Sequence, residues 1–163
     1  MNGKPCQENF FASGTVQIQS VGLFLIFFGS LKNLLKKIYV GAIDGKHIAI
    51  LQPANSGTLY YNYKGYSSIV LLAVCDANYK FLYASFGSYG SSSDGGIFDK
   101  CDLKRAIVES KLNLPPVEKL PRSNTALPFF FVGDGAFPLM KNLMKPYPGK
   151  NLSIRQETHN YRF

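Results

Sequence analysis

Residues 39–51, YVGAIDGKHIAIL, are the stretch that most constrains what this chain can fold into. Apolar and β-branched residues surround one carboxylate, that of Asp44, which predicts a buried strand with a charge in its middle. Because an unpaired buried charge is unfavourable, such an aspartate needs a cation, a hydrogen-bond network or a metal ion beside it. The rest of the fold must therefore bring a compensating group to Asp44.

The size and composition of the chain predict one globular domain with its own core. The chain has 163 residues, of which 46% are hydrophobic and 17% are charged. Its net charge is +8, yet eight of its ten acidic residues lie between positions 41 and 140. A basic rim around an acidic centre would suit a polyanion that meets a metal-loaded site. The alternative is a surface that is basic without any such role.

Residues 1–38 are expected to form an atypical tail and an amphipathic helix. The first 20 residues show no sustained period, whereas apolar spacings of three and four predict a helix over residues 21–40. We expect this helix to pack on the domain, with a membrane-surface helix as the alternative. No membrane-spanning segment is expected, because the apolar run 21–28 is shorter than the roughly 20 residues that a span needs.

The pattern beyond residue 40 predicts three sequential strands and a later fourth one. The strands are expected at residues 43–51, 68–76, 81–86 and 129–132, with helices at 97–111 and 136–145. Prolines predict a surface excursion over 113–128, and residues 147–163 read as a basic tail. Three cysteines without C-x-x-C spacing and two histidines indicate no zinc site.

A second carboxylate, that of Asp134, follows the buried strand expected at 129–132. If Asp44 and Asp134 lie in adjacent strands, each raises the pKa of the other unless a cation lies between them. Mg²⁺ and Mn²⁺ prefer carboxylate oxygens and water, and two such ions can clamp a phosphodiester, as in nucleases. Asp94 either caps the helix expected at 97–111 or faces this metal site. The bland alternative is that these are unrelated aspartates at strand ends.

Two lysines are candidate nucleic-acid contacts. Lys46 follows Asp44 by two positions and so shares its strand face, whereas His47 points to the other face as a satisfied polar group. Lys64 is interleaved with tyrosines at positions 60, 61, 63 and 66. These rings either stack on bases or pack under the loop with their hydroxyls in water.

Several ordered motifs strongly resemble the PIF/Harbinger transposase-derived nucleases of the DDE superfamily. They are GAIDGKHI at Asp44, YYNYKGY at 60–66, GSYGSSSDGGIF at Asp94, VGDGAFPL at Asp134, PYPGKNL and NYRF. The resemblance covers about residues 40–163. It implies an RNase H-like α/β fold, a mixed sheet of three antiparallel strands plus a fourth parallel strand with flanking helices. It also implies catalytic roles for Asp44 and Asp134, and a place near the metals for Asp94.

The resemblance further implies a divalent metal cation, Mg²⁺ or Mn²⁺, a DNA substrate, nuclear localisation and a Myb-like DNA-binding partner protein. The family's third acid is expected roughly ten residues beyond the NYR motif, where it completes the metal shell. The sequence ends at Phe163, and Glu157 precedes the motif, so it is a poor substitute. We therefore expect a partial DDE-type nuclease domain at 39–163, incomplete at its C-terminus, from a truncated copy or an incomplete gene model.

The function expected is divalent-metal-dependent cleavage of DNA phosphodiester bonds. The alternative is a catalytically inactive DNA- or protein-binding remnant of a transposase, to which the basic ends would contribute. A third possibility is a fragment that does not fold stably, because loss of a packed helix exposes core surface.

Overall fold

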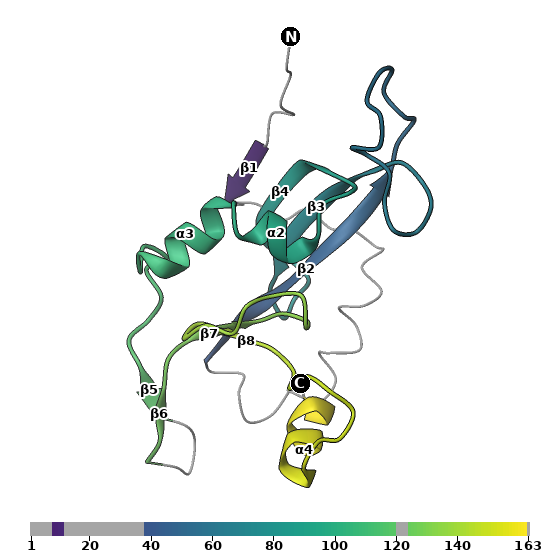
Figure 1. The fold of residues 1–163 in the computed structure, drawn as a ribbon. Helices are drawn as coiled ribbons and strands as arrows, with labels where there is room; N and C mark the ends of the chain where they lie inside the picture. The colour runs from purple at the N-terminus through teal and green to yellow at the C-terminus, as the bar shows by residue number, and fades with distance from the viewer. Residues whose placement is uncertain (1–7, 12–37, 120–123, 163) are drawn as a thin grey trace.

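A six-stranded mixed sheet forms the centre of the computed structural model, which describes residues 8–11, 38–119 and 124–162 (Figure 1). The strand order is β1-β4-β3-β2-β7-β8. The strands are β1 (Glu8–Phe11), β2 (Tyr39–Ala49), β3 (Ser68–Cys75), β4 (Phe81–Tyr89), β7 (Phe130–Val132) and β8 (Leu143–Met144). A separate hairpin consists of β5 (Glu118–Lys119) and β6 (Ala126–Leu127). The helices are α2 (Asp94–Phe98), α3 (Asp102–Val108) and α4 (Ile154–Arg162).

The predicted RNase H-like strand arrangement is confirmed. Strands β2, β3 and β4 form an antiparallel meander, and β7 pairs with β2 in parallel. Two further strands extend the sheet: β1 pairs with β4 at one edge, and β8 pairs with β7 at the other. A mixed sheet with helices is the expected α/β architecture.

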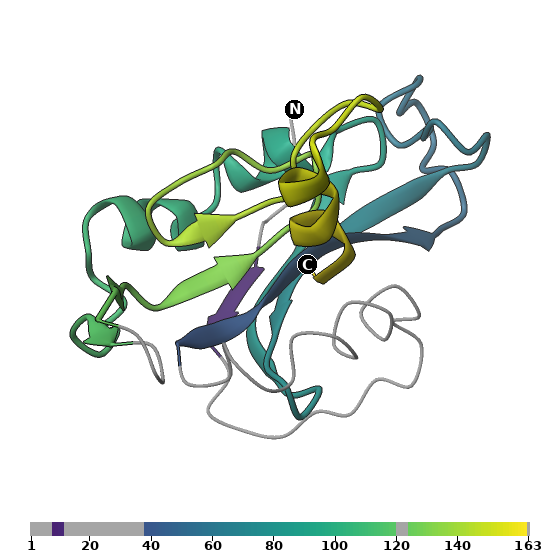
Figure 2. The same cartoon turned by 90° about the horizontal axis from the view of Figure 1, so that it is seen from below.

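The two faces of the sheet have separate cores. On one face, Val70, Leu72 and Val74 of β3 pack with Phe98 of α2 and Leu103 of α3. On the other face, the smaller cluster of Ala42, Ala73, Cys75 and Phe81 is buried. Figure 2 shows α2 and α3 together on one side of the strands. The first face is therefore the one that α2 and α3 cover.

Four local predictions were wrong. The helix expected at 97–111 is split into α2 and α3, and the one expected at 136–145 is a turn followed by β8. The tail expected at 147–163 contains helix α4. The helix expected over 21–40 cannot extend to its predicted end, because Tyr39 and Val40 belong to β2; its residues up to position 37 lie outside the described part of the chain.

Core burial explains why the split helix and the new strand form. Cys101, at the break between α2 and α3, is buried beside Phe98, so the chain turns there to place both side chains inside. Leu143 is fully buried, and β8 brings it to the core while Gly133 N donates to Met144 O (2.9 Å). Tertiary packing therefore overrides the local pattern. Within the described ranges, no helix has the length and apolar character to cross a membrane.

Candidate functional site

Asp44 and Asp134 lie at the same level of two neighbouring strands. Ala42 of β2 is paired with Val132 of β7 in parallel register. Each aspartate follows its paired residue by two positions in the same direction, so both carboxylates lie at the same end of this strand pair. Asp44 Oδ1 accepts a hydrogen bond from Gly45 N (2.8 Å), and Asp134 Oδ1 accepts one from Ala136 N (2.9 Å). The juxtaposition predicted from the sequence is thus present in the fold.

Asp94 joins this region from helix α2. A Cβ atom at Gly45 would overlap with the Asp94 carboxylate, and one at Gly95 would overlap with Ala136 O. Both glycines are therefore needed for the close approach of α2 to β2 and to the turn after Asp134. The predicted capping role belongs to Ser93, whose Oγ accepts from Gly96 N (3.2 Å). Asp94 is the first residue of the helix, and its carboxylate faces β2.

The carboxylates of Asp44 and Asp94 approach β2 from opposite faces. Asp44 is paired with Ala73 and alternates with Ala42, both in the smaller core cluster. Gly45 alternates with Ile43, which belongs to the helix-side cluster, and Asp94 lies over Gly45. Asp134, at the end of the neighbouring strand, acts electrostatically on both of the other aspartates. The three carboxylates therefore surround the end of one strand pair rather than share one face.

Burial is the main reason why the pKa of Asp44 is raised from 3.8 to about 6. The hydrogen bond from Gly45 lowers this pKa, whereas the negative charges of Asp94 and Asp134 raise it further. Lys46 has the smallest effect and lowers it. A half-buried carboxylate that is destabilised by two neighbouring acids is a group that a bound cation would stabilise.

Burial also raises the pKa of Asp94, with the charge of Asp134 adding to the effect. His47 and Lys64 act in the opposite direction on this group. In turn, burial lowers the pKa of His47, so its imidazole favours the neutral form. His47 alternates with Gly45, over which Asp94 lies, so it shares the Asp94 side of β2, whereas Lys46 alternates with Asp44.

The pair of Asp44 and Asp134 fits a divalent cation such as Mg²⁺ or Mn²⁺. Mg²⁺ is usually held by one or two carboxylates and keeps several waters, so two protein ligands are sufficient to bind it. A larger set is not preformed: among the residues that the structure describes, no three His, Cys, Asp or Glu side chains come together as a ligand group. Glu157 of α4 is exposed and does not contribute to the charges that act on Asp44 or Asp94.

The sequence patterns did not reveal the turn that connects β2 and β3 as a built element. Asn62 in this turn is buried, and its Oδ1 accepts from Lys64 N (2.9 Å). Its Nδ2 donates to Ser68 Oγ (2.8 Å), which lies 2.9 Å from His47 Nδ1. The available signal was Asn62 with Gly65 three residues later, since asparagine and glycine at this spacing are typical of tight turns.

The terminal motifs PYPGKNL and NYRF contact each other. Asn160 of α4 accepts from Tyr147 N (2.8 Å) through Oδ1 and donates to Tyr147 O (2.9 Å) through Nδ2. The rings of Tyr147 and His159 meet edge to face, with centroids 5.0 Å apart. This clamp attaches α4 to the segment that follows β8.

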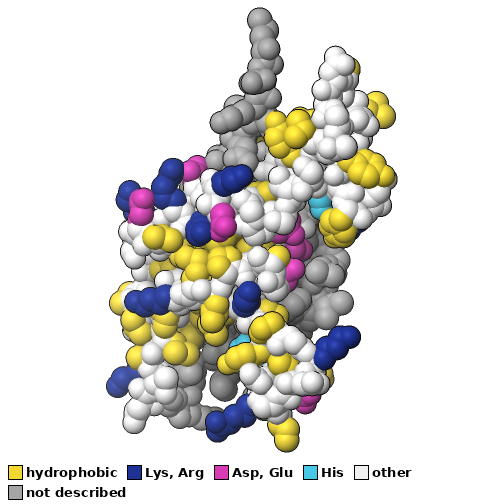
Figure 3. Space-filling model, viewed as in Figure 1, with side chains coloured by type: hydrophobic (Ala, Val, Ile, Leu, Met, Phe, Trp, Pro, Cys, Tyr) yellow, Lys and Arg dark blue, Asp and Glu magenta, His cyan; other side chains and the backbone are white. Residues whose placement is uncertain are grey.

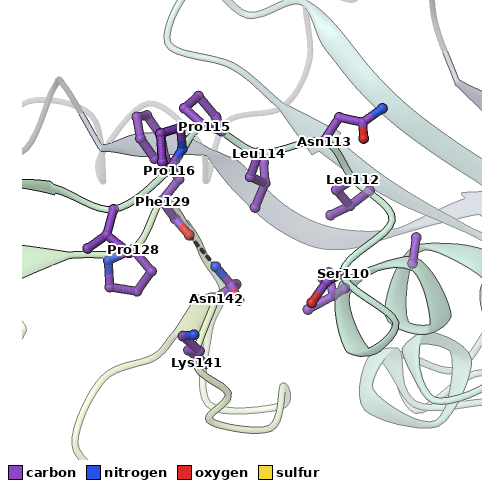
Figure 4. Close-up of a pocket in the computed structure, with 13 residues that line it drawn as sticks. Ser110, Leu112, Asn113, Leu114, Pro115, Pro116, Pro128, Phe129, Lys141 and Asn142 are labelled. Atoms are coloured by element: carbon purple, nitrogen blue, oxygen red, sulfur yellow. Dashed lines mark hydrogen bonds between the residues drawn. The ribbon is translucent and has the colours of Figure 1, made fainter.

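A cavity of 360 Å³ lies away from the carboxylates, between the end of α3 and the proline-rich segment (Figure 4). Leu114, Pro116 and Phe129 line it, with Lys141 at its rim, and Asn142 Nδ2 donates to Phe129 O (2.6 Å). None of the three aspartates lines this cavity, so it is not part of the candidate metal site.

Comparison with known proteins agrees with this geometry. Residues 43–163 match the family model described as DDE superfamily endonuclease. The chain is 36% identical over 126 residues to Protein ALP1-like of Arabidopsis thaliana, which covers 75% of this chain and 30% of that relative. This chain thus spans less than a third of the curated relative's length. No solved structure matches it. The chain belongs to the DDE superfamily endonuclease family, and its resemblance to the Harbinger transposase-derived proteins is confirmed.

Proposed function

We propose that this chain is a divalent-metal-dependent nuclease that cleaves DNA phosphodiester bonds in the nucleus. The observation that carries the proposal is the level position of Asp44, in the middle of β2, and Asp134, just beyond the parallel strand β7, with the charged form of Asp44 destabilised by burial and by its acidic neighbours. Membership of the DDE superfamily endonuclease family supports it.

Each polar group at the strand ends has a place in this proposal. Asp44 and Asp134 hold the cation, and Asp94, on the other side of β2, adds negative charge near it. A divalent cation bound there would polarise the phosphate that is cleaved and activate a water molecule. Lys46, exposed on the Asp44 face, and Lys64, near Asp94, contact DNA phosphates.

Plasmid nicking tests this function directly. Supercoiled plasmid is incubated with the chain and Mn²⁺, and the appearance of open circles is followed on a gel. Asp44→Asn and Asp134→Asn should each abolish nicking, whereas Asp99→Asn, which removes only an exposed ion pair with Lys104, should not. Nicking that survives both site substitutions would sink the proposal.

A catalytically inactive DNA-binding remnant is the second candidate. The lack of a preformed three-residue ligand group within the described ranges favours it. In that case the net charge of +8 carries the function, and DNA affinity falls steeply with salt but does not depend on metal or on the aspartates. A Myb-like DNA-binding partner is proposed for either case; co-purification of a nuclear partner that binds DNA through its own domain tests it.

A further inference from the structure

Residues 60–66 form a rigid turn, which we call the tyrosine turn, beside the carboxylate site. Asn62 is only 3% exposed although it belongs to a surface turn. Besides its side-chain bonds to Lys64 N and Ser68 Oγ, its backbone N donates to Tyr66 O (2.9 Å) and its carbonyl accepts from Gly65 N (3.1 Å). A turn with this many internal bonds holds the backbone of its two central residues in one conformation.

Those two central side chains are Tyr63 and Lys64. The Tyr63 ring is 84% exposed, so most of its surface faces solvent. One neighbour is His47, whose ring meets it edge to face with centroids 5.5 Å apart. The other is Lys64, whose Nζ lies 5.5 Å from the centroid of the ring. An exposed aromatic ring supported by a histidine and accompanied by an ammonium group is the combination that binds a base and its phosphate.

The tyrosine turn is attached to the candidate active site through His47. This residue follows Asp44 by three positions on β2, and its Nδ1 lies 2.9 Å from Ser68 Oγ, to which Asn62 also donates. The charge of Asp94 acts on His47, and that of Lys64 acts on Asp94. Figure 3 shows hydrophobic side chains gathered on the loops at upper right and acidic side chains just below them. The tyrosine turn therefore lies beside the carboxylate site, on the Asp94 side of β2.

We propose that Tyr63 is a stacking platform for an unpaired nucleobase of the DNA strand that enters the carboxylate site, and that Lys64 binds the phosphate next to this base. The occupant is an unpaired base because the faces of bases within a duplex are already stacked on their neighbours. The inference rests on the proposed function, since it places the base on the DNA that the nuclease would cleave.

Binding without metal tests the platform separately from cleavage. The full chain is titrated in EDTA against fluorescein-labelled hairpin DNA with a short unpaired 3′ extension, and anisotropy is recorded. Tyr63→Ala should weaken binding at least about tenfold, and Tyr63→Phe should retain it, because the ring provides the stacking. Tyr161→Ala is the matched control, since Tyr161 on α4 is also 84% exposed. Lys64→Ala should reduce the slope of log affinity against log salt by about 1.

The base itself supplies a second test. An abasic nucleotide in the extension should weaken binding to the wild type and have no further effect on Tyr63→Ala, because both changes remove the same stack. A Tyr63→Ala chain that binds as the wild type does, or that loses affinity equally for blunt duplex, would overturn the platform. So would an equal loss in the Tyr161→Ala control.

The nicking assay distinguishes failure of the platform from failure of the nuclease. If nicking requires Asp44 but the Tyr63→Ala chain binds DNA as the wild type does, the proposed nuclease function stands and the proposed stacking role of Tyr63 is overturned. Conversely, binding that depends on both Tyr63 and the unpaired base supports the platform even if no nicking is found.

Discussion

The carboxylate of Asp94 occupies the space that a side chain at Gly45 would fill. Because Gly45 directly follows Asp44, this contact brings the first turn of α2 next to the central acid of β2. At the other end of the contact region, Gly95 lies against Ala136 O, two residues after Asp134. The lack of side chains at Gly45 and Gly95 therefore determines how closely α2 approaches β2 and the turn after Asp134.

Substitution of Gly45 tests this packing. Gly45→Ala should lower the free energy of unfolding by about 1–3 kcal/mol, because the new methyl group displaces the Asp94 carboxylate or β2 itself. In chemical denaturation the midpoint should fall. Gly135→Ala is the control, since a Cβ atom there meets nothing within 4 Å. Equal stability of the Gly45→Ala protein and the wild type would contradict the described contact.

Asp44 makes the stability of the metal-free protein depend on pH. Its pKa is 3.8 in the unfolded chain and about 6 in the folded one, so the folded state binds the proton more tightly. Stability is therefore greatest below about pH 4 for this group and falls as the pH rises through 6. Asp44→Asn, which mimics the neutral acid, should be about 1 kcal/mol more stable than the wild type at pH 8, after allowance for solvent screening.

Thermal denaturation in EDTA between pH 4 and pH 8 measures this difference. The gap between Asp44→Asn and the wild type should close toward pH 4. Asp99→Asn, at an exposed ion pair with Lys104, should show no such gap. An Asp44→Asn protein that is less stable than the wild type at pH 8 would contradict the assignment.

The clamp between Asn160 and Tyr147 should determine whether α4 stays docked. Asn160→Ala removes the hydrogen bonds to the backbone N–H and carbonyl of Tyr147 and should destabilise the docked helix by about 1 kcal/mol. Hydrogen exchange of the amides in 154–162 should accelerate, while exchange in β3 stays unchanged. Arg155→Ala, an exposed change on the same helix, serves as the control. Unchanged protection of α4 in Asn160→Ala would show that other contacts hold it.

Sequence patterns predicted the strand meander well, with Asp44 inside one strand and Asp134 just beyond another. Alternation and buried apolar runs act locally, so β2, β3 and β4 were found with small boundary errors. The parallel pairing of β7 with β2 came from the family resemblance rather than from periodicity, and the metal-binding roles of the aspartates stay predictions.

Other features depend on contacts between distant residues. Cys101 precedes α3 as its N-cap and is buried in the core with Phe98, the last residue of α2, which no local pattern records. The start of α4 did have a signal: Ser153 and Gln156 form a capping box, in which Gln156 Oε1 accepts from Ser153 N (2.9 Å). The positions of the Asp44 and Asp94 carboxylates on opposite faces of β2 could not be predicted from the sequence, because they depend on the packing of Asp94 over Gly45.

Calorimetric titration of the full chain with Mn²⁺ tests most directly the claim that Asp44 and Asp134 together hold a divalent cation. Binding to the wild type should be saturable, weakened at least about tenfold in Asp44→Asn and in Asp134→Asn, and unchanged in Asp99→Asn. Wild-type affinity in the double variant Asp44→Asn/Asp134→Asn would contradict the claim.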